Sequence, residues 1–202
     1  MPTLEIDTPF GGARAHVDAA ADARAVLVLG HGAGGGVNAP DLTAAAGVAR
    51  SLGMTVVLVE QPYRVAGRRS PAPAHQLDAA WRAVIEHLLA GELRGQALVT
   101  GGRSSGARVA CRTAAATGAS AVLCLAFPLL PPRRSGSAQS RLPELEAVTV
   151  PTLVVQGKRD PFGIPPAGEL RTVALVEADH SLRTDRVAVG EAVRAWLDSL
   201  LG

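Results

Sequence analysis

The residues best suited to do chemistry lie in one short turn, Gly102-Arg103-Ser104-Ser105-Gly106. In this G-x-S-x-G pattern, small residues two positions before and after the serine let a strand and a helix approach closely. The serine is then held in a strained, exposed conformation that suits a nucleophile. The flanking sequence fits, because residues 96–100 are typical of a short strand and residues 107–116 of a helix. We call residues 101–106 the serine turn.

A serine hydroxyl is a poor nucleophile alone, and two later residues are placed to activate it. Asp160 follows a predicted strand at residues 152–155, and His180 follows another at residues 173–176. In open α/β sheets reactive groups gather at the carboxyl ends of the strands, so both are expected near Ser104. The histidine would accept the serine proton, and the carboxylate would fix the histidine tautomer. The order Ser, Asp, His is the one that α/β hydrolases use, so we predict a catalytic triad of these three residues.

Structural roles for the same residues remain open. Asp160 precedes Pro161 and is also typical of a turn, while His180 is also consistent with a loop histidine bonded to backbone. Asp179 is the rival acid, but neighbouring side chains in an extended loop point apart, which favours Asp160. The remaining histidines outside the glycine-rich segment described next are expected to be surface or structural residues: His16, His75 and His87.

A glycine-rich segment, residues 30–36, follows an early apolar strand, and we call it the glycine loop. Hydrolysis through a serine requires backbone N–H donors aimed at the oxyanion. One is expected from Ser105, the residue after the nucleophile, and the other from Ala33, with Gly34 as the next candidate. His31 is expected to brace this loop through hydrogen bonds and to transfer no proton.

The glycine loop also supports an alternative, a dinucleotide-binding oxidoreductase. Gly30, Gly32 and Gly35 form G-x-G-x-x-G after a strand, and Glu60 ends the next strand as a ribose-binding acid would. Against this, residues 37–40 intervene before the helical pattern, and the alternative leaves the candidate triad unexplained. The sequence has no phosphate-binding P-loop pattern and no Cys/His cluster with metal-ligand spacing, so we expect neither cofactor nor metal.

Buried strands and helices alternate along the chain. Residues 3–6 and 13–17 form a predicted edge hairpin, residues 60–74 a loop without regular structure, and Glu144 marks a possible short helix. Further strands are predicted at 25–29, 54–59, 96–100, 121–126, 152–155 and 173–176, and helices at 41–52, from Leu77 to Gly91, at 107–116 and from Val189 to Leu200. Asn38, Pro40 and Asp41 mark the start of the first of these helices. The alternation predicts an α/β fold with a doubly wound, mostly parallel sheet.

Composition sets the remaining expectations. A length of 202 residues favours a single domain, residues 1–202, and a sequence with 48% hydrophobic but 3% aromatic residues predicts a core of Ala, Val and Leu. The net charge of +2 comes from isolated arginines, which argues against nucleic-acid binding. Cys111 and Cys124 are expected to be buried free thiols. The sequence shows neither a signal segment nor a long apolar run, so we expect a soluble, cytoplasmic protein without membrane contact.

Several stretches together resemble the small, lidless α/β hydrolases that include dienelactone-hydrolase-like and testis-expressed hydrolase-like proteins. The matching stretches span most of the chain: residues 30–35, 62–69, 101–106, 155–163 and 179–180. The resemblance implies a Ser104/Asp160/His180 triad, a serine in place of the cysteine of true dienelactone hydrolases, no cap domain and no established substrate. One similar branch contains a subunit of a histone acetyltransferase complex, so a non-catalytic interaction module is the second functional hypothesis.

The predicted activity is hydrolysis of a small ester or thioester, with a small-molecule acyl compound as partner. The connection from Phe127 to Val150 is too short for an independent lid domain, so we expect an open cleft. Arg64, Arg68 and Arg69 carry positive charge onto the same side of the sheet, with Arg133 and Arg134 as further candidates. They are either solvated or bind an anionic group of the substrate. The second interpretation predicts a preference for short, carboxylate-bearing esters.

Overall fold

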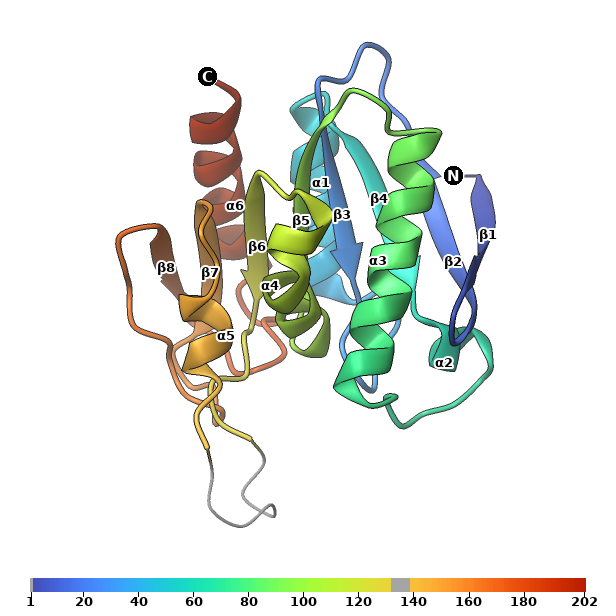
Figure 1. Ribbon diagram of the computed structural model, residues 1–202. Coiled ribbons are helices and arrows are strands. Elements are labelled where there is room, and N and C mark those ends of the chain that lie inside the picture. The colour runs from blue at the N-terminus through green and yellow to red at the C-terminus, as the bar shows by residue number, and fades with distance from the viewer. Residues whose placement is uncertain (1, 132–138) are drawn as a thin grey trace.

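The computed structural model describes residues 2–131 and 139–202, and its strands form one eight-stranded sheet in the order β1-β2-β4-β3-β5-β6-β7-β8 (Figure 1). β1 and β4 each pair antiparallel with β2, whereas all pairs from β4 to β8 are parallel. The strands are β1 (Thr3–Thr8), β2 (Gly11–Asp18), β3 (Ala25–Gly30), β4 (Thr55–Glu60), β5 (Ala97–Arg103), β6 (Ala121–Leu125), β7 (Thr152–Gly157) and β8 (Arg171–Val176). This mostly parallel sheet confirms the predicted fold class.

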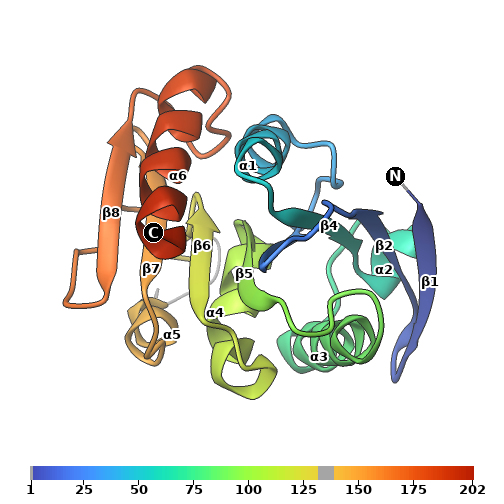
Figure 2. The same ribbon diagram turned by 90° about the horizontal axis from the view of Figure 1, so that it is seen from above.

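Helices cover both faces of the sheet. They are α1 (Pro40–Ser51), α2 (Pro62–Val65), α3 (Ala74–Ala90), α4 (Ser105–Thr117), α5 (Leu142–Glu146) and α6 (Arg186–Leu201). Figure 2 shows α1 and α6 on one face and α3, α4 and α5 on the other. The strands β3 and β7 are buried at every residue, because helices exclude water from both of their faces. The core on each side is mainly Ala, Val and Leu, as expected, with Trp81 in one layer and Trp196 in the other.

The carboxyl ends of the parallel strands lie at one edge of the sheet, the lower edge in Figure 1. β5 ends at Arg103 and is followed at once by Ser104 and α4. β7 ends at Gly157, three residues before Asp160, and β8 ends at Val176, four residues before His180. The topology therefore delivers all three candidate residues to the same edge.

Two local predictions are corrected by the structure. Residues 60–74 were expected to lack regular structure, yet Pro62–Val65 form α2, since a proline is well tolerated in the first turn of a helix. Asn38 does not cap α1: Ala39 occupies the N-cap and makes no side-chain capping hydrogen bond. The predicted short helix near Glu144 is confirmed as α5.

Cys111 and Cys124 are buried free thiols, as predicted, with their sulfur atoms 3.4 Å apart. The hydrogen bond with Cys111, together with burial, raises the pKa of the Cys124 thiol well above its usual value. Cys124 therefore stays a protonated thiol near neutral pH.

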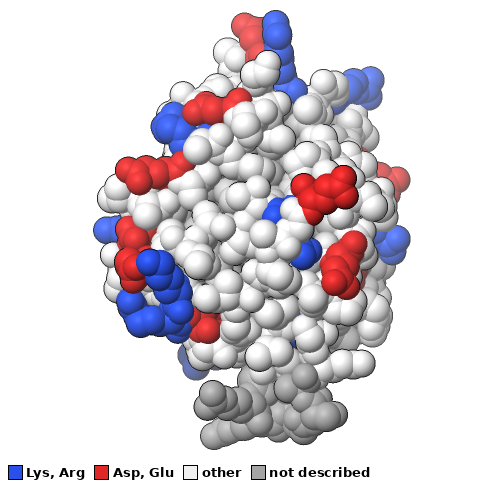
Figure 3. Space-filling model, turned by 90° about the vertical axis from the view of Figure 1, so that its left-hand side faces the viewer, with Lys and Arg blue, Asp and Glu red and all other residues white. Residues whose placement is uncertain are grey.

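Charged residues are scattered over the surface. On the face in Figure 3, acidic and basic side chains lie in small groups of both signs among uncharged residues. In the described ranges, no helix is both long enough and apolar enough to cross a membrane. Arg133 and Arg134 lie outside the described residues.

Candidate active site

Ser104 occupies a sharp turn between β5 and α4, with φ 52° and ψ −106°. A positive φ is costly for a residue with a side chain, and it persists here because the surrounding backbone is tightly packed. A Cβ on Gly102 would lie 2.6 Å from the carbonyl oxygen of Gly30, and one on Gly106 would collide with the same carbonyl. Only glycines therefore allow the serine turn to approach β3, and this approach holds Ser104 in place.

Ser104, His180 and Asp160 form a continuous hydrogen-bonded chain. The Ser104 hydroxyl donates to His180 Nε2 at 3.0 Å, and His180 Nδ1 donates to Asp160 Oδ2 at 2.8 Å. The carboxylate can only accept, so it assigns the ring proton to Nδ1 and leaves Nε2 as the acceptor. In this tautomer the histidine is ready to take the serine proton.

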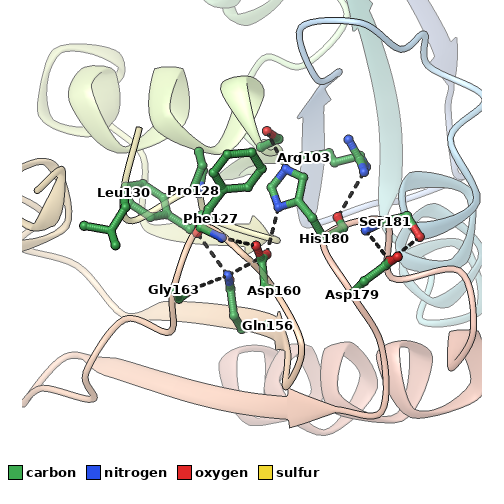
Figure 4. Close-up of polar contacts among 12 residues, drawn as sticks. Arg103, Phe127, Pro128, Leu130, Gln156, Asp160, Gly163, Asp179, His180 and Ser181 are labelled. Atoms are coloured by element: carbon green, nitrogen blue, oxygen red, sulfur yellow. Dashed lines mark hydrogen bonds and ion pairs between the residues drawn. The ribbon is translucent and has the colours of Figure 1, made fainter. Parts of the chain in front are cut away.

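The side chain of Asp160 is fully buried, and each of its oxygens is bonded. Oδ1 accepts from the Phe162 backbone N–H at 2.8 Å, while Oδ2 also accepts from Gln156 Nε2 at 2.8 Å (Figure 4). The Phe162 ring packs edge-on against the His180 ring, with centroids 4.6 Å apart. A buried carboxylate needs such partners to remain charged, so these contacts both stabilise and aim Asp160.

Asp179, the alternative acid, bonds to Ser181 and not to the His180 ring. Asp179 is exposed, and its Oδ1 accepts from the backbone N–H and hydroxyl of Ser181 at 2.8 and 2.6 Å (Figure 4). The hydrogen bond from the Ser181 hydroxyl lowers the pKa of Asp179. Asp179 therefore shapes the turn before Ser181 and makes no hydrogen bond to the His180 ring.

The glycine loop lies across the cleft from His180. Among the described residues nothing accepts a hydrogen bond from the backbone N–H of Ala33, Gly34 or Ser105. The Tyr63 hydroxyl donates to the Ala33 carbonyl at 3.0 Å. In the trans peptide between Ala33 and Gly34, the N–H of Gly34 points opposite to this carbonyl and so away from Tyr63. Ala33, Gly34 and Ser104 line one cleft together with Ser105. These N–H groups are thus available to an oxyanion.

His31 braces this loop through its ring. Its Nδ1 donates to the Gly32 carbonyl at 2.8 Å, and its Nε2 accepts from the Gln61 backbone N–H at 3.1 Å. Burial lowers the pKa of His31, so the ring stays neutral and keeps this donor and acceptor pattern. The loop does not open a helix at Gly35, because α1 begins only at Pro40, unlike the arrangement a dinucleotide site needs.

Residues 23–196 match the model of a family described as alpha/beta hydrolase domain. The chain belongs to this family. Solved structures with the same fold include an alpha-beta serine hydrolase homologue from Coxiella burnetii, at 16% identity and a TM-score of 0.78 over 97% of both chains. A lidless serine hydrolase from Xanthomonas campestris is 24% identical, with a TM-score of 0.72 over 96% of this chain and 94% of that one.

A dienelactone hydrolase from Anabaena variabilis is 15% identical, with a TM-score of 0.76 over 98% of this chain and 96% of that one. The sequence matches none of the curated proteins with which it was compared. The family and fold anticipated from the sequence motifs are therefore confirmed.

The cleft of this alpha/beta hydrolase beside Ser104 has a volume of about 420 Å³. Its walls combine apolar and charged side chains with the groups already described. Beyond the candidate triad and the N–H donors, the lining residues are Pro71, Arg103, Arg108, Pro128, Arg141 and Phe162. A volume of this size suits a small molecule.

The three arginines predicted to bind substrate do not line this cleft. Arg68 borders a separate pocket of about 210 Å³ formed with residues such as Phe10 and Leu77. Arg64 Nη1 donates to the Arg68 carbonyl at 3.4 Å, and Arg69 is exposed. Arg64 belongs to α2, which packs against β2.

Sequence reasoning missed Gln156, Arg103, Arg108 and Arg141. Gln156 had a usable signal, since it is the polar residue in an otherwise apolar strand run before Gly157. Arg103 precedes the serine directly, but nothing in the motif indicates which partners its long side chain meets. Arg108 and Arg141 come from α4 and the start of α5, and only the fold brings them to one cleft.

Proposed function

We propose that this alpha/beta hydrolase is a serine hydrolase that cleaves small esters or thioesters through an acyl-enzyme intermediate. The proposal rests on one observation, the hydrogen-bonded chain from the Ser104 hydroxyl through His180 to Asp160. The nucleophile contacts the base, and the base contacts the orienting acid. Acyl transfer through serine requires this arrangement.

In the first half-reaction, Ser104 Oγ attacks the substrate carbonyl carbon while His180 Nε2 takes the hydroxyl proton. The carbonyl oxygen becomes an oxyanion, which accepts hydrogen bonds from the N–H groups of Ser105 and of Ala33 or Gly34 in this proposal. Collapse of this intermediate breaks the bond to the leaving alkoxide or thiolate, which receives the proton from His180 Nε2. The product is an acyl ester on Ser104.

In the second half-reaction, water attacks the acyl carbonyl, and His180 Nε2 accepts a proton from that water. The carbon–Oγ bond then breaks, Ser104 regains its proton from His180, and the carboxylic acid leaves. Throughout, Asp160 remains ionised and stabilises the transient imidazolium.

The charges around the cleft favour a substrate that carries a carboxylate. Arg103 forms an ion pair with Asp41, and Arg108 donates to both oxygens of Glu144. Arg141 instead donates to the carbonyls of Pro128 and Leu130, at 3.1 and 3.4 Å, with no carboxylate within ion-pair distance in the described residues. Burial, followed by the charge of Arg108, lowers the pKa of Arg141, but a guanidinium remains charged near neutral pH. A substrate carboxylate would supply the missing counter-charge.

A panel of short-acyl esters and thioesters tests this function. We expect wild type to hydrolyse short-chain members and Ser104→Ala to lose turnover, with no activation by lipid interfaces. Arg141→Gln is expected to lower kcat/KM for a carboxylate-bearing ester about 10- to 100-fold relative to a neutral ester of equal length, the scale of one charged hydrogen bond. Arg69→Gln, an exposed arginine outside the cleft, is the matched control.

Two outcomes would favour the alternatives. A folded wild type without turnover or covalent labelling would favour an interaction module. Saturable, tight binding of a nicotinamide or flavin nucleotide would favour an oxidoreductase.

A further inference from the structure

Arg103, the residue before the nucleophile, contacts three separate parts of the cleft through one guanidinium. Its Nε forms an ion pair with Asp41 Oδ2 at 2.9 Å. Its Nη2 donates to the backbone carbonyl of His180 at 3.0 Å (Figure 4). Its Nη1 lies against the glycine loop, because a Cβ built on Gly32 would be only 3.0 Å from it. One side chain therefore joins the serine turn, the His180 loop and the glycine loop.

Asp41 is an unusual partner, because its side chain is fully buried in the first turn of α1. Its other oxygen accepts the N–H of Leu42 at 3.0 Å. Burial raises the pKa of Asp41, and the charge of Arg103 opposes that shift. A buried charge is tolerated when it is paired, and the pair also neutralises Arg103. Arg103 is thus committed to the protein and is not a free cation for the substrate.

The contact to His180 matters because it joins the backbone of that residue directly to the serine turn. His180 lies in the connection between β8 and α6, 77 residues from Arg103, and its ring contacts Asp160, Ser104 and Phe162. The ring position also depends on where its backbone sits. Arg103 ties the His180 carbonyl to the serine turn.

We propose that Arg103, held by Asp41, is a positioning residue that sets the distance between His180 and Ser104. The proposal rests on the serine-hydrolase function. A guanidinium suits this role because its planar fork directs N–H groups toward several acceptors at once, whereas a lysine ammonium is a single flexible point charge. A misplacement of about 1 Å in such a constellation reduces the rate about 10²-fold.

The test compares Arg103→Lys with Arg112→Lys. Arg112 is a matched control, since its side chain is 18% exposed against 19% for Arg103, and it forms ion pairs with Asp78 and Glu144 but is not among the residues that line the cleft. We expect Arg103→Lys to lower kcat about 10²-fold with a KM change below about threefold, equally for neutral and carboxylate-bearing esters. Arg112→Lys should keep kcat near wild type. In Arg103→Ala, added guanidinium at millimolar concentration should restore part of the lost kcat.

Three results would overturn the proposal: unchanged kcat in Arg103→Lys, a loss confined to carboxylate-bearing esters, or an equal kcat loss in both lysine variants. If Arg103→Lys does not fold, the double variant Asp41→Asn/Arg103→Met removes both charges together and should show the same kcat loss.

A readout without turnover separates this proposal from the proposed function. The His180 Nδ1 proton shared with Asp160 should give a low-field NMR signal in wild type and Arg112→Lys, and lose it through faster exchange in Arg103→Lys. A persistent signal in Arg103→Lys would overturn the positioning role even if no substrate were found. Absent turnover in wild type with the expected NMR change would instead overturn the proposed function alone.

Discussion

The serine turn and the second half of the glycine loop are both rich in glycine, but for different physical reasons. At Gly101, Gly102 and Gly106 a Cβ would collide with backbone atoms, whereas at Gly34, Gly35 and Gly36 it would meet nothing within 4 Å. The serine turn is therefore fixed by packing against β3 and β6. The glycine loop is held by the side chains of His31 and Tyr63. The serine-turn side of the cleft is closely packed, and the glycine-loop side is tethered at a few points.

The largest loss of activity is expected from a substitution at Asp160. Asp160→Asn is expected to lower kcat by about 10⁴-fold, because an amide can hold the wrong tautomer of His180. Asp179→Asn, whose carboxylate faces Ser181, should change kcat by less than about threefold, in line with the small effects of exposed charges. Steady-state kinetics on a short ester compares the two, and a larger effect at Asp179 would transfer the acid role to it.

Packing of the serine turn is tested by adding one methyl group. Gly106→Ala is expected to reduce the free energy of unfolding by about 3 kcal/mol or more, since the new Cβ meets the backbone of Gly30 and His31. Gly35→Ala, in open space, should change it by less than about 1 kcal/mol. Urea denaturation measures both, and equal effects would remove the distinction between the two segments.

Loss of the hydrogen bond from Tyr63 to Ala33 should lower kcat less than loss of a catalytic group. Tyr63→Phe removes the hydrogen bond that orients the Ala33–Gly34 peptide, so kcat is expected to fall about tenfold, below the 10²–10³-fold loss of removing an oxyanion donor itself. Burial raises the pKa of Tyr63 to about 12, so the hydroxyl remains a donor at alkaline pH. An unchanged kcat would show that the peptide is held without it.

The smallest effect is expected from His31 and appears as a pH dependence. Its pKa is lowered in the folded state, so the unfolded chain binds a proton first as pH falls through about 6.5. This contribution to stability is full above that pH and is lost as pH falls toward the folded pKa. His31→Gln should therefore show a smaller loss of unfolding free energy between pH 7 and pH 5 than wild type. A parallel dependence in the two proteins would contradict this.

The apolar runs, and the glycine residues in the turns that follow them, are enough to predict the fold. They also predict the strand ends that bring Ser104, Asp160 and His180 together. Burial of β3 and β6 on both faces corresponds to unbroken apolar runs in the sequence, and β7 contains the shorter apolar run of residues 153–155. By contrast, Asp41 was expected to be only a residue of a helix first turn. Its pairing with Arg103 depends on how α1 docks beside β5, which no local pattern encodes.

The arginines illustrate the same limit. Arg68 and Arg69 follow β4 on the correct edge of the sheet, but neither lines the cleft, and Arg68 borders the pocket that contains Phe10. Arg141 enters the cleft from the segment before α5, and its role depends on the carbonyls of Pro128 and Leu130. A long side chain reaches far enough that its partners are decided by tertiary packing, not by spacing along the chain.

The central claim is that His180 and Asp160 activate Ser104 as a nucleophile, and labelling with a fluorophosphonate tests it without knowledge of the substrate. We predict covalent labelling of wild type at the peptide that contains Ser104, none in Ser104→Ala, and strongly slowed labelling in Asp160→Asn. Labelling that persists in Ser104→Ala, or a folded wild type that is not labelled, would contradict the account.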